Sequence, residues 1–288
     1  MTSGRTLTLL TLPLLLGASA VAQDATKHNL SLRFQPEAVR HLHFAQSINT
    51  AMDMGGQKMV TTAEMATFLT VSVQSTNDTG ARLKQEVTRV KAVMDGPLME
   101  VDYDSDDEDS DPGMLQGIDE LVGAMCTMNL SNHGVVSGLE MSEEASATAG
   151  GGIDLKNVVD QTFTELPTDP VAIGETWMTK ESLPVGQMGT PEAKVTNTLL
   201  AVSATTIIIS KTYDLDPSKV QPAPGMEASA FKASSQITID RASGTPTDMV
   251  MNLTMTAGND LTSLNVSATV TCKPAPAKKP NPTPPGKK

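Results

Sequence analysis

The chain has 288 residues, of which 33 are acidic and 21 are lysine or arginine, so its formal net charge is −12 at neutral pH. This balance argues against nucleic acid as a partner, because affinity for phosphate backbones comes mainly from basic side chains. Aromatic residues make up only 3% of the chain, which also argues against base-stacking platforms.

The N-terminal residues predict a secretory signal peptide. They carry one positive charge at Arg5, an apolar run over 7–16 and several small residues up to Ala22. Cleavage is expected after Ala20 or Ala22, preferably Ala22, so residues 1–22 form the signal. The apolar run is shorter than the roughly 20 residues that span a bilayer, and no later segment approaches that length. We expect an exported protein of the periplasm or extracellular space that does not span a membrane.

The first half of the mature chain is predicted to form antiparallel strands. Polar and apolar residues alternate with a period of two, and Val, Thr and Met are abundant, as in strands with one buried face. Strands are expected over residues 29–34, 39–54 and 59–75, from residue 81, and on either side of a turn at 132–134.

Two short helices are predicted next. Apolar residues recur at helical spacing over 115–125 and form one face of the first helix. Residues 141–152 are rich in Ser, Ala and Gly and are interpreted as a flexible connection. The second helix, over 153–163, leads into the second half.

The second half is again predicted to be strands, over 192–203, 205–214, 228–240, 246–257 and 261–272. Short turns join the last three into an antiparallel meander. We therefore expect one mainly β domain over 23–272, with strand-rich halves at about 29–140 and 166–272. Residues 273–288 contain six prolines and five lysines, which predicts a disordered tail. This tail is interpreted as a solvated terminus, with contact to an anionic envelope polymer as the alternative.

The stretch LPTDPVAIGETW, at 166–177, is predicted to be a stiff crossover between the halves. Pro167 and Pro170 fix φ and lack amide donors, so this segment lies outside any central ladder. Gly174 supplies a turn, and Trp177 begins the next strand as a buried anchor. A proline-rich ligand for a partner domain is the alternative.

The chain has two cysteines, Cys126 and Cys272. An oxidising compartment permits them to form a disulfide, which we expect. Two unpaired thiols that act as small buried apolar groups are the alternative.

The pattern L-P-x-x-P-V-x-x-G-E-x-W, with MDMGGQKM at 52–59, YDS at 103–105 and ITIDRASG at 237–244, resembles a family of uncharacterised secreted bacterial proteins typical of planctomycetes. The resemblance covers roughly residues 29–272 and carries over no catalytic residue. It implies a large curved antiparallel sheet similar to the half-barrels of periplasmic lipoprotein carriers, so the expected fold class is mainly β, half-barrel-like, with two short helices.

No metal site, cofactor or catalytic constellation is predicted. Residues 102–111 are strongly acidic, but Asp107 stands where a calcium loop needs glycine, and Gly113 where it needs a bidentate glutamate. A solvated loop is therefore preferred to a calcium site. His41 and His43 share one strand face at a spacing that metal sites use, but no third ligand is evident. Nucleophile-elbow, zinc-protease and phosphate-loop motifs are missing, so we do not expect an enzyme.

Methionine is the most suggestive residue type, with 17 in the chain. Met249, Met251, Leu253 and Met255 alternate along one predicted strand and so share a face. Methionine adapts to irregular apolar shapes, as a binder of apolar molecules or lipids requires, although it also fills ordinary cores. The sequence therefore predicts an exported, non-enzymatic protein that binds an apolar ligand or lipid on a concave sheet face. A structural or interaction protein of the cell envelope is the alternative.

Overall fold

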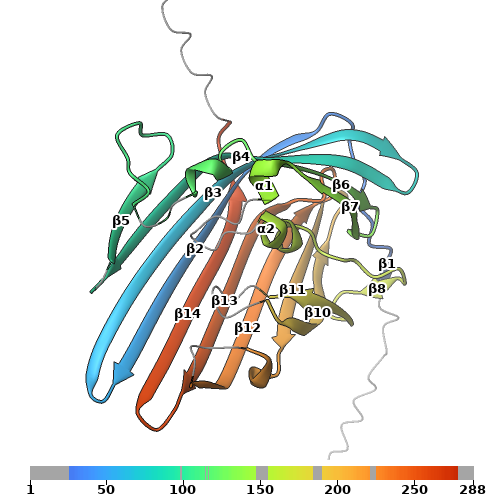
Figure 1. Ribbon diagram of the computed structural model, residues 1–288. Helices are drawn as coiled ribbons and strands as arrows, with labels where there is room; N and C mark the ends of the chain where they lie inside the picture. Colours follow the sequence, from blue (N-terminus) through green and yellow to red (C-terminus); the bar gives the residue numbers. More distant parts are fainter. Residues whose placement is uncertain are drawn as a thin grey trace, which may run out of the picture.

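The computed structural model describes residues 26–97, 99–113, 115, 117–146, 155–183, 190–220 and 225–277 (Figure 1). Its first half contains β1 (Lys27–His28), β2 (Val39–Met54), β3 (Gln57–Asn77), β4 (Gly80–Gly96), β5 (Met99–Asp104), the 3₁₀ turn η1 (Asp119–Leu121), β6 (Met125–Ser131), β7 (Val136–Met141) and α1 (Glu143–Ser146). Its second half contains α2 (Leu155–Thr162), β8 (Val171–Ala172), β9 (Thr176–Ser182), β10 (Glu192–Val202), β11 (Thr206–Asp214), the 3₁₀ turn η3 (Pro217–Lys219), β12 (Glu227–Asp240), β13 (Pro246–Gly258) and β14 (Thr262–Pro274).

One antiparallel sheet of twelve strands organises the described residues, in the order β7-β6-β4-β3-β2-β14-β13-β12-β11-β10-β9, with β5 beside β4. The two halves of the chain join where β2 pairs with β14 over thirteen residue pairs. The sheet is curved but not closed, and strands hold 62% of the described residues. The prediction of a mainly β, half-barrel-like sheet with two short helices is confirmed.

The two faces of the sheet differ in chemistry. Along β13, Met249, Met251 and Leu253 are buried, whereas Val250 and Asn252 between them are exposed on the opposite face. The buried residues lie on the face that α2 covers, which is the concave side of the sheet (Figure 1). On β14 the convex positions from 263 to 271 are all Ser, Asn or Thr. The period-two alternation therefore separates a largely apolar concave face from a mostly polar convex face, on which valines such as Val60, Val93 and Val250 are exposed.

Buried side chains on the concave face form two clusters. The first core lies between the strands of both halves and the covering segments, with Ile118 of the loop before η1 and Leu155 of α2 in contact with it. The second core lies further along β10–β14 and includes Met251, Leu253 and Met255. Each buried large apolar side chain contributes about 1.5–3 kcal/mol, so these clusters hold the covering segments on the sheet.

Three predicted elements differ from the structure. Residues 115–125 do not form one helix, because Gly117 and Gly123 adopt positive φ and only η1 forms between them. The apolar spacing there reflects burial of the loop in the first core. The connection predicted to be flexible begins with helix α1. Residues 29–34 do not form a strand, because the N–H groups of this segment donate to separate loops, as Leu32 does to the carbonyl of Asn132.

The LPTDPVAIGETW segment connects α2 to β9, and only its last two residues, Thr176 and Trp177, belong to a strand of the large sheet. Pro167 and Pro170 lie in its irregular part, and β8 pairs only with β1 among the described strands. Gly174 has a φ of +88°, and the adjacent Glu175 accepts a hydrogen bond of 2.8 Å from the N–H of Ala172. This geometry makes the glycine the turn into β9, because left-handed φ values favour glycine.

Trp177, the second residue of β9, is half-buried against the first core. Its indole N–H donates to the backbone carbonyl of Glu165 over 3.4 Å. The ring thus connects the start of β9 to the segment that follows α2. Its role as an anchor remains a prediction, with a smaller expected contribution than a fully buried indole would have.

Cys126 and Cys272 are free thiols buried in the first core, so the expected disulfide is not formed in this structure. Cys126 lies on β6 and Cys272 on β14, with β4, β3 and β2 between them. At about 4.8 Å per strand spacing they are on the order of 20 Å apart along the sheet, whereas a disulfide spans Cα atoms within about 7 Å. The structure corresponds to the alternative of two buried thiols.

Strand β14 continues to Pro274, two residues past the expected domain end at Cys272. The predicted signal peptide at 1–22 and the tail from residue 278 lie outside the described residues. Among the residues that the structure describes, no helix is long and apolar enough to cross a membrane.

Candidate ligand-binding site

The four residues predicted to bind an apolar ligand lie side by side on β13. Met249, Met251, Leu253 and Met255 all face the concave side, and their exposed fractions are only 5%, 6%, 8% and 2%. They therefore form a floor that other side chains largely cover. The structure brings these residues together, whereas their role in binding a ligand remains a prediction.

The apolar face becomes more open on the neighbouring strands. Four apolar side chains on the concave face of β2 and β3 are half-buried, and we call this set the apolar strip: Ile48, Met52, Met59 and Met65. The half-buried polar residues Gln46, Thr50 and Thr61 lie on the same face between them. Met52 lies opposite Met59 on β3 and next to Leu264 on β14, so the strip continues into the second core. The concave face thus combines a covered floor on β13 with an accessible apolar margin.

A polar cluster interrupts the apolar face near α2. Lys211 on β11 has a side chain only 6% exposed, and its Nζ lies 2.7 Å from a carboxylate oxygen of Glu181 on β9. Both side chains face the concave side across β10. A charge buried this deeply requires a partner, since an unpaired one would be strongly destabilising.

Three neutral groups surround this ion pair. The hydroxyl of Tyr213 lies 3.4 Å from Oγ of Ser235, and burial, with the nearby charge of Glu181, raises the pKa of the phenol above its usual range. Asn197 is fully buried and pairs in register with Lys211. Its Nδ2 donates to Thr179, while its Oδ1 has no hydrogen-bond partner among the described residues. We call Glu181, Asn197, Lys211, Tyr213 and Ser235 the polar cluster.

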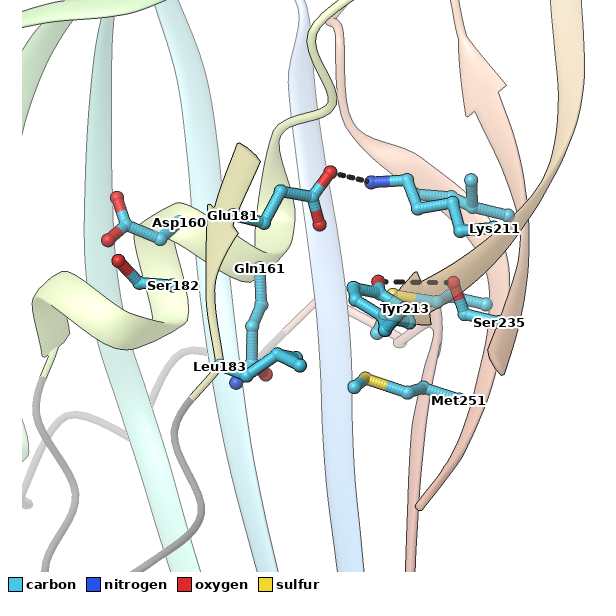
Figure 2. A pocket seen from close by; sticks show the side chains of 11 residues that line it. Asp160, Gln161, Glu181, Ser182, Leu183, Lys211, Tyr213, Ser235 and Met251 are labelled. Carbon is cyan, nitrogen blue, oxygen red and sulfur yellow. Dashed lines mark hydrogen bonds and ion pairs between the residues drawn. The ribbon is translucent and has the colours of Figure 1, made fainter. Parts of the chain in front are cut away.

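A cavity of about 20 Å³ lies between α2 and this part of the sheet (Figure 2). Its polar side is formed by Glu181, Lys211, Tyr213 and Ser235 together with residues of α2, and its apolar side includes Met249 and Met251. Since a water molecule needs at least about 10–15 Å³ of such space, the cavity admits one small polar group and not a whole lipid.

Two carboxylates of the acidic loop at 102–111 are paired with the protein's own cations. Asp104 accepts hydrogen bonds from Nε and Nη2 of Arg89 and forms an ion pair with Lys91, while Asp106 pairs with Arg89. Hydrogen bonding from Arg89 holds the pKa of Asp104 well below its usual range, with Lys91 adding to the effect. These contacts favour a structural role for Asp104 and Asp106 over calcium binding by these two carboxylates.

The two histidines considered as metal ligands contact neighbouring side chains. His41 lies within hydrogen-bond distance of the Thr70 hydroxyl, and His43 stacks on Phe68 with ring centroids 4.6 Å apart. Burial, and secondarily the charge of Arg89, lowers the pKa of His43. Within the described ranges no three His, Cys, Asp or Glu side chains are placed to hold a metal ion.

The polar cluster was missed at the level of sequence, although a signal exists. Ile207, Ile209, Lys211 and Tyr213 alternate with period two, so Lys211 occupies a position that the pattern places inside. Asn197 similarly occupies an inward position between Val195 and Leu199. A polar residue in an inward register position is thus the feature that identifies the cluster.

Comparisons with known proteins concern family and fold. Residues 147–246 match the model of a family of unknown function (DUF6263), in agreement with the expectation of an uncharacterised family. A search of curated proteins found no match.

A solved structure on lipid–protein interactions in lipovitellin is similar to 86% of this chain, with 10% identity and a TM-score of 0.51. The matched region spans 26% of that protein. DynF from the dynemicin pathway of Micromonospora chersina matches over 93% of this chain and 92% of its own, with 11% identity and a TM-score of 0.22. The translocator domain of the autotransporter NalP from Neisseria meningitidis matches over 84% and 90%, with 7% identity and a TM-score of 0.27. The lipovitellin likeness concerns the fold alone, and the scores of the other two are too low to support an argument.

Proposed function

We propose that the protein is an exported, non-enzymatic carrier that binds an apolar ligand of the lipid class on the concave face of its sheet. The observation that carries this proposal is the difference between the faces: the concave side holds the buried apolar core, whereas the convex side is mostly polar apart from a few exposed valines. The apolar strip leaves part of that concave face accessible. An accessible apolar surface of this kind commonly marks a binding site.

The energetics favour a flexible apolar chain as the ligand. Each methylene group removed from water contributes about 0.8 kcal/mol, so several groups laid along the strip suffice for measurable affinity. Methionine side chains adapt to the irregular shape of such a chain. Lipovitellin, whose solved structure concerns lipid–protein interactions, has a sheet of similar fold, and this analogy supports lipid as the ligand class.

Export rests on the predicted signal at 1–22, and the non-enzymatic role rests on the missing catalytic motifs. The alternative is an interaction protein of the cell envelope, and one observation favours it. The floor residues on β13 are at most 8% exposed, so that part of the concave face is already filled by the protein itself. Ligand binding on the strip would distinguish the two functions.

The test uses the delipidated full chain and the uncharged apolar dye N-phenylnaphthylamine, which fluoresces in apolar surroundings. Ile48→Glu places a charge in the apolar strip, whereas Asn49→Glu places it on the exposed convex side of the same strand. We expect saturable binding whose Kd rises at least about tenfold for Ile48→Glu, which corresponds to about 1.4 kcal/mol. The Kd of the control Asn49→Glu should remain within about twofold of the wild-type Kd. Equal effects of both substitutions, or no saturable binding, would contradict a concave-face carrier.

A further inference from the structure

We propose that the polar cluster selects a ligand with an uncharged, hydrogen-bonding head group, such as a hydroxyl- or ester-bearing lipid. This inference rests on the proposed function and names the substrate class of that same concave face. It starts from the position of the cavity, which has charged and hydroxyl groups on one side and methionine on the other (Figure 2). Such a boundary matches an amphiphile, whose head meets the polar side while its chain follows the apolar side.

The charges of the cluster cancel. Lys211 and Glu181 form a direct ion pair at 2.7 Å, and Asp160, where α2 lines the cavity, pairs with Lys156 at 2.9 Å. An anionic head group would approach Lys211 but also meet the carboxylate of Glu181. A cationic head group would be attracted by Glu181 but repelled by Lys211. Either charge would also lose its hydration at a buried site, so both charged forms are disfavoured.

The hydrogen-bonding groups of the cluster suit a neutral partner. The hydroxyls of Tyr213 and Ser235 line the cavity and can each donate or accept. The Tyr213 hydroxyl also interacts with the carboxylate of Glu181. Its contact with Ser235, at 3.4 Å, is long for an O–H···O bond, so a head-group oxygen would compete mainly for the hydroxyl of Ser235. The cavity of about 20 Å³ admits one hydroxyl or carbonyl group, which limits recognition to the head-group atom that enters.

The test compares three ligands with the same unsaturated chain but different heads: monoolein, oleate and oleylamine. Binding to the full chain is measured at neutral pH by displacement of the uncharged dye. For the wild type we expect monoolein to bind at least about tenfold more tightly than either charged ligand. Glu181→Gln leaves Lys211 without its counter-charge, so the preference should shift toward oleate by at least about tenfold. Lys211→Met should shift it toward oleylamine by a similar factor.

The double variant Glu181→Gln/Lys211→Met is the matched control, because it restores charge balance without the ion pair and should again prefer monoolein. Each preference is a ratio measured within one variant, so a general loss of stability cancels from it. Circular dichroism checks that each variant is folded. If all variants bind but the ratios do not change, the head-group proposal is overturned while the carrier function stands. If the wild type binds none of the three ligands and no dye, both proposals fail.

Discussion

Replacing Gln85, a buried residue inside β4, with methionine is expected to stabilise the protein. The side chain is 0% exposed, and both its amide nitrogen and oxygen lack hydrogen-bond partners among the described residues. Its register partners, Val71 on β3 and Cys126 on β6, are buried apolar groups. A buried polar group without a partner costs about 1–3 kcal/mol, whereas methionine of similar length fits an apolar site.

We therefore expect Gln85→Met to raise the free energy of unfolding by about 1–3 kcal/mol. For a domain of this size, each kcal/mol raises the Tm by about 2–4 °C. Thermal and urea unfolding followed by circular dichroism measure both quantities. The control is Gln236→Met, an exposed position on β12, which should change stability by less than about 0.5 kcal/mol. A clear loss of stability for Gln85→Met would refute the reasoning and indicate that the buried amide is satisfied.

Gly134→Ala should destabilise the protein far more than Gly123→Ala. Both glycines have positive φ, but a Cβ at Gly134 would lie 2.0 Å from a backbone oxygen, whereas a Cβ at Gly123 would meet no atom within 4 Å. The Tm values of the two variants from thermal melts test this. Asp104→Asn should lower stability by about 1–2 kcal/mol at neutral pH. The arginine hydrogen bond lowers the pKa of Asp104 in the folded state, so the stability difference between wild type and Asp104→Asn should shrink as pH falls below about 4. If the urea midpoints of the two proteins instead differ by the same amount at every pH, this account is wrong. Cys126 and Cys272 should resist a water-soluble thiol reagent in the native protein, because both are buried and burial raises the pKa of Cys126 to about 11. Both thiols should react once the protein is unfolded in urea without a reductant. If neither thiol reacts in urea, the two cysteines form a disulfide.

Strands were predictable where polar and apolar residues alternate over many positions and one face of the strand is buried. The strand expected over 39–54 matches β2 at both ends, because period-two burial and the glycines at 55 and 56 define it locally. The meander of the last three strands follows for the same reason. The helix predicted over 115–125 was wrong because apolar residues at helical spacing indicate burial, and a buried loop can show the same spacing.

The candidate site was only partly predictable. The common face of Met249 and Met255 follows from strand geometry alone. The contact of Glu181 with Lys211 joins strands 30 residues apart, and only the order of strands in the folded sheet brings them together. Which face is concave depends on the curvature of the whole sheet, which no local pattern encodes.

Native mass spectrometry of the full chain, purified without detergent from the compartment in which it accumulates, tests the carrier function most directly. We expect a fraction of the protein to carry one apolar adduct that organic extraction releases, and added monoolein to refill the extracted protein. Ile48→Glu should lack the adduct, while Asn49→Glu should retain it. A single ligand-free mass for the wild type, unchanged after addition of monoolein, would contradict a carrier function and favour the envelope interaction protein.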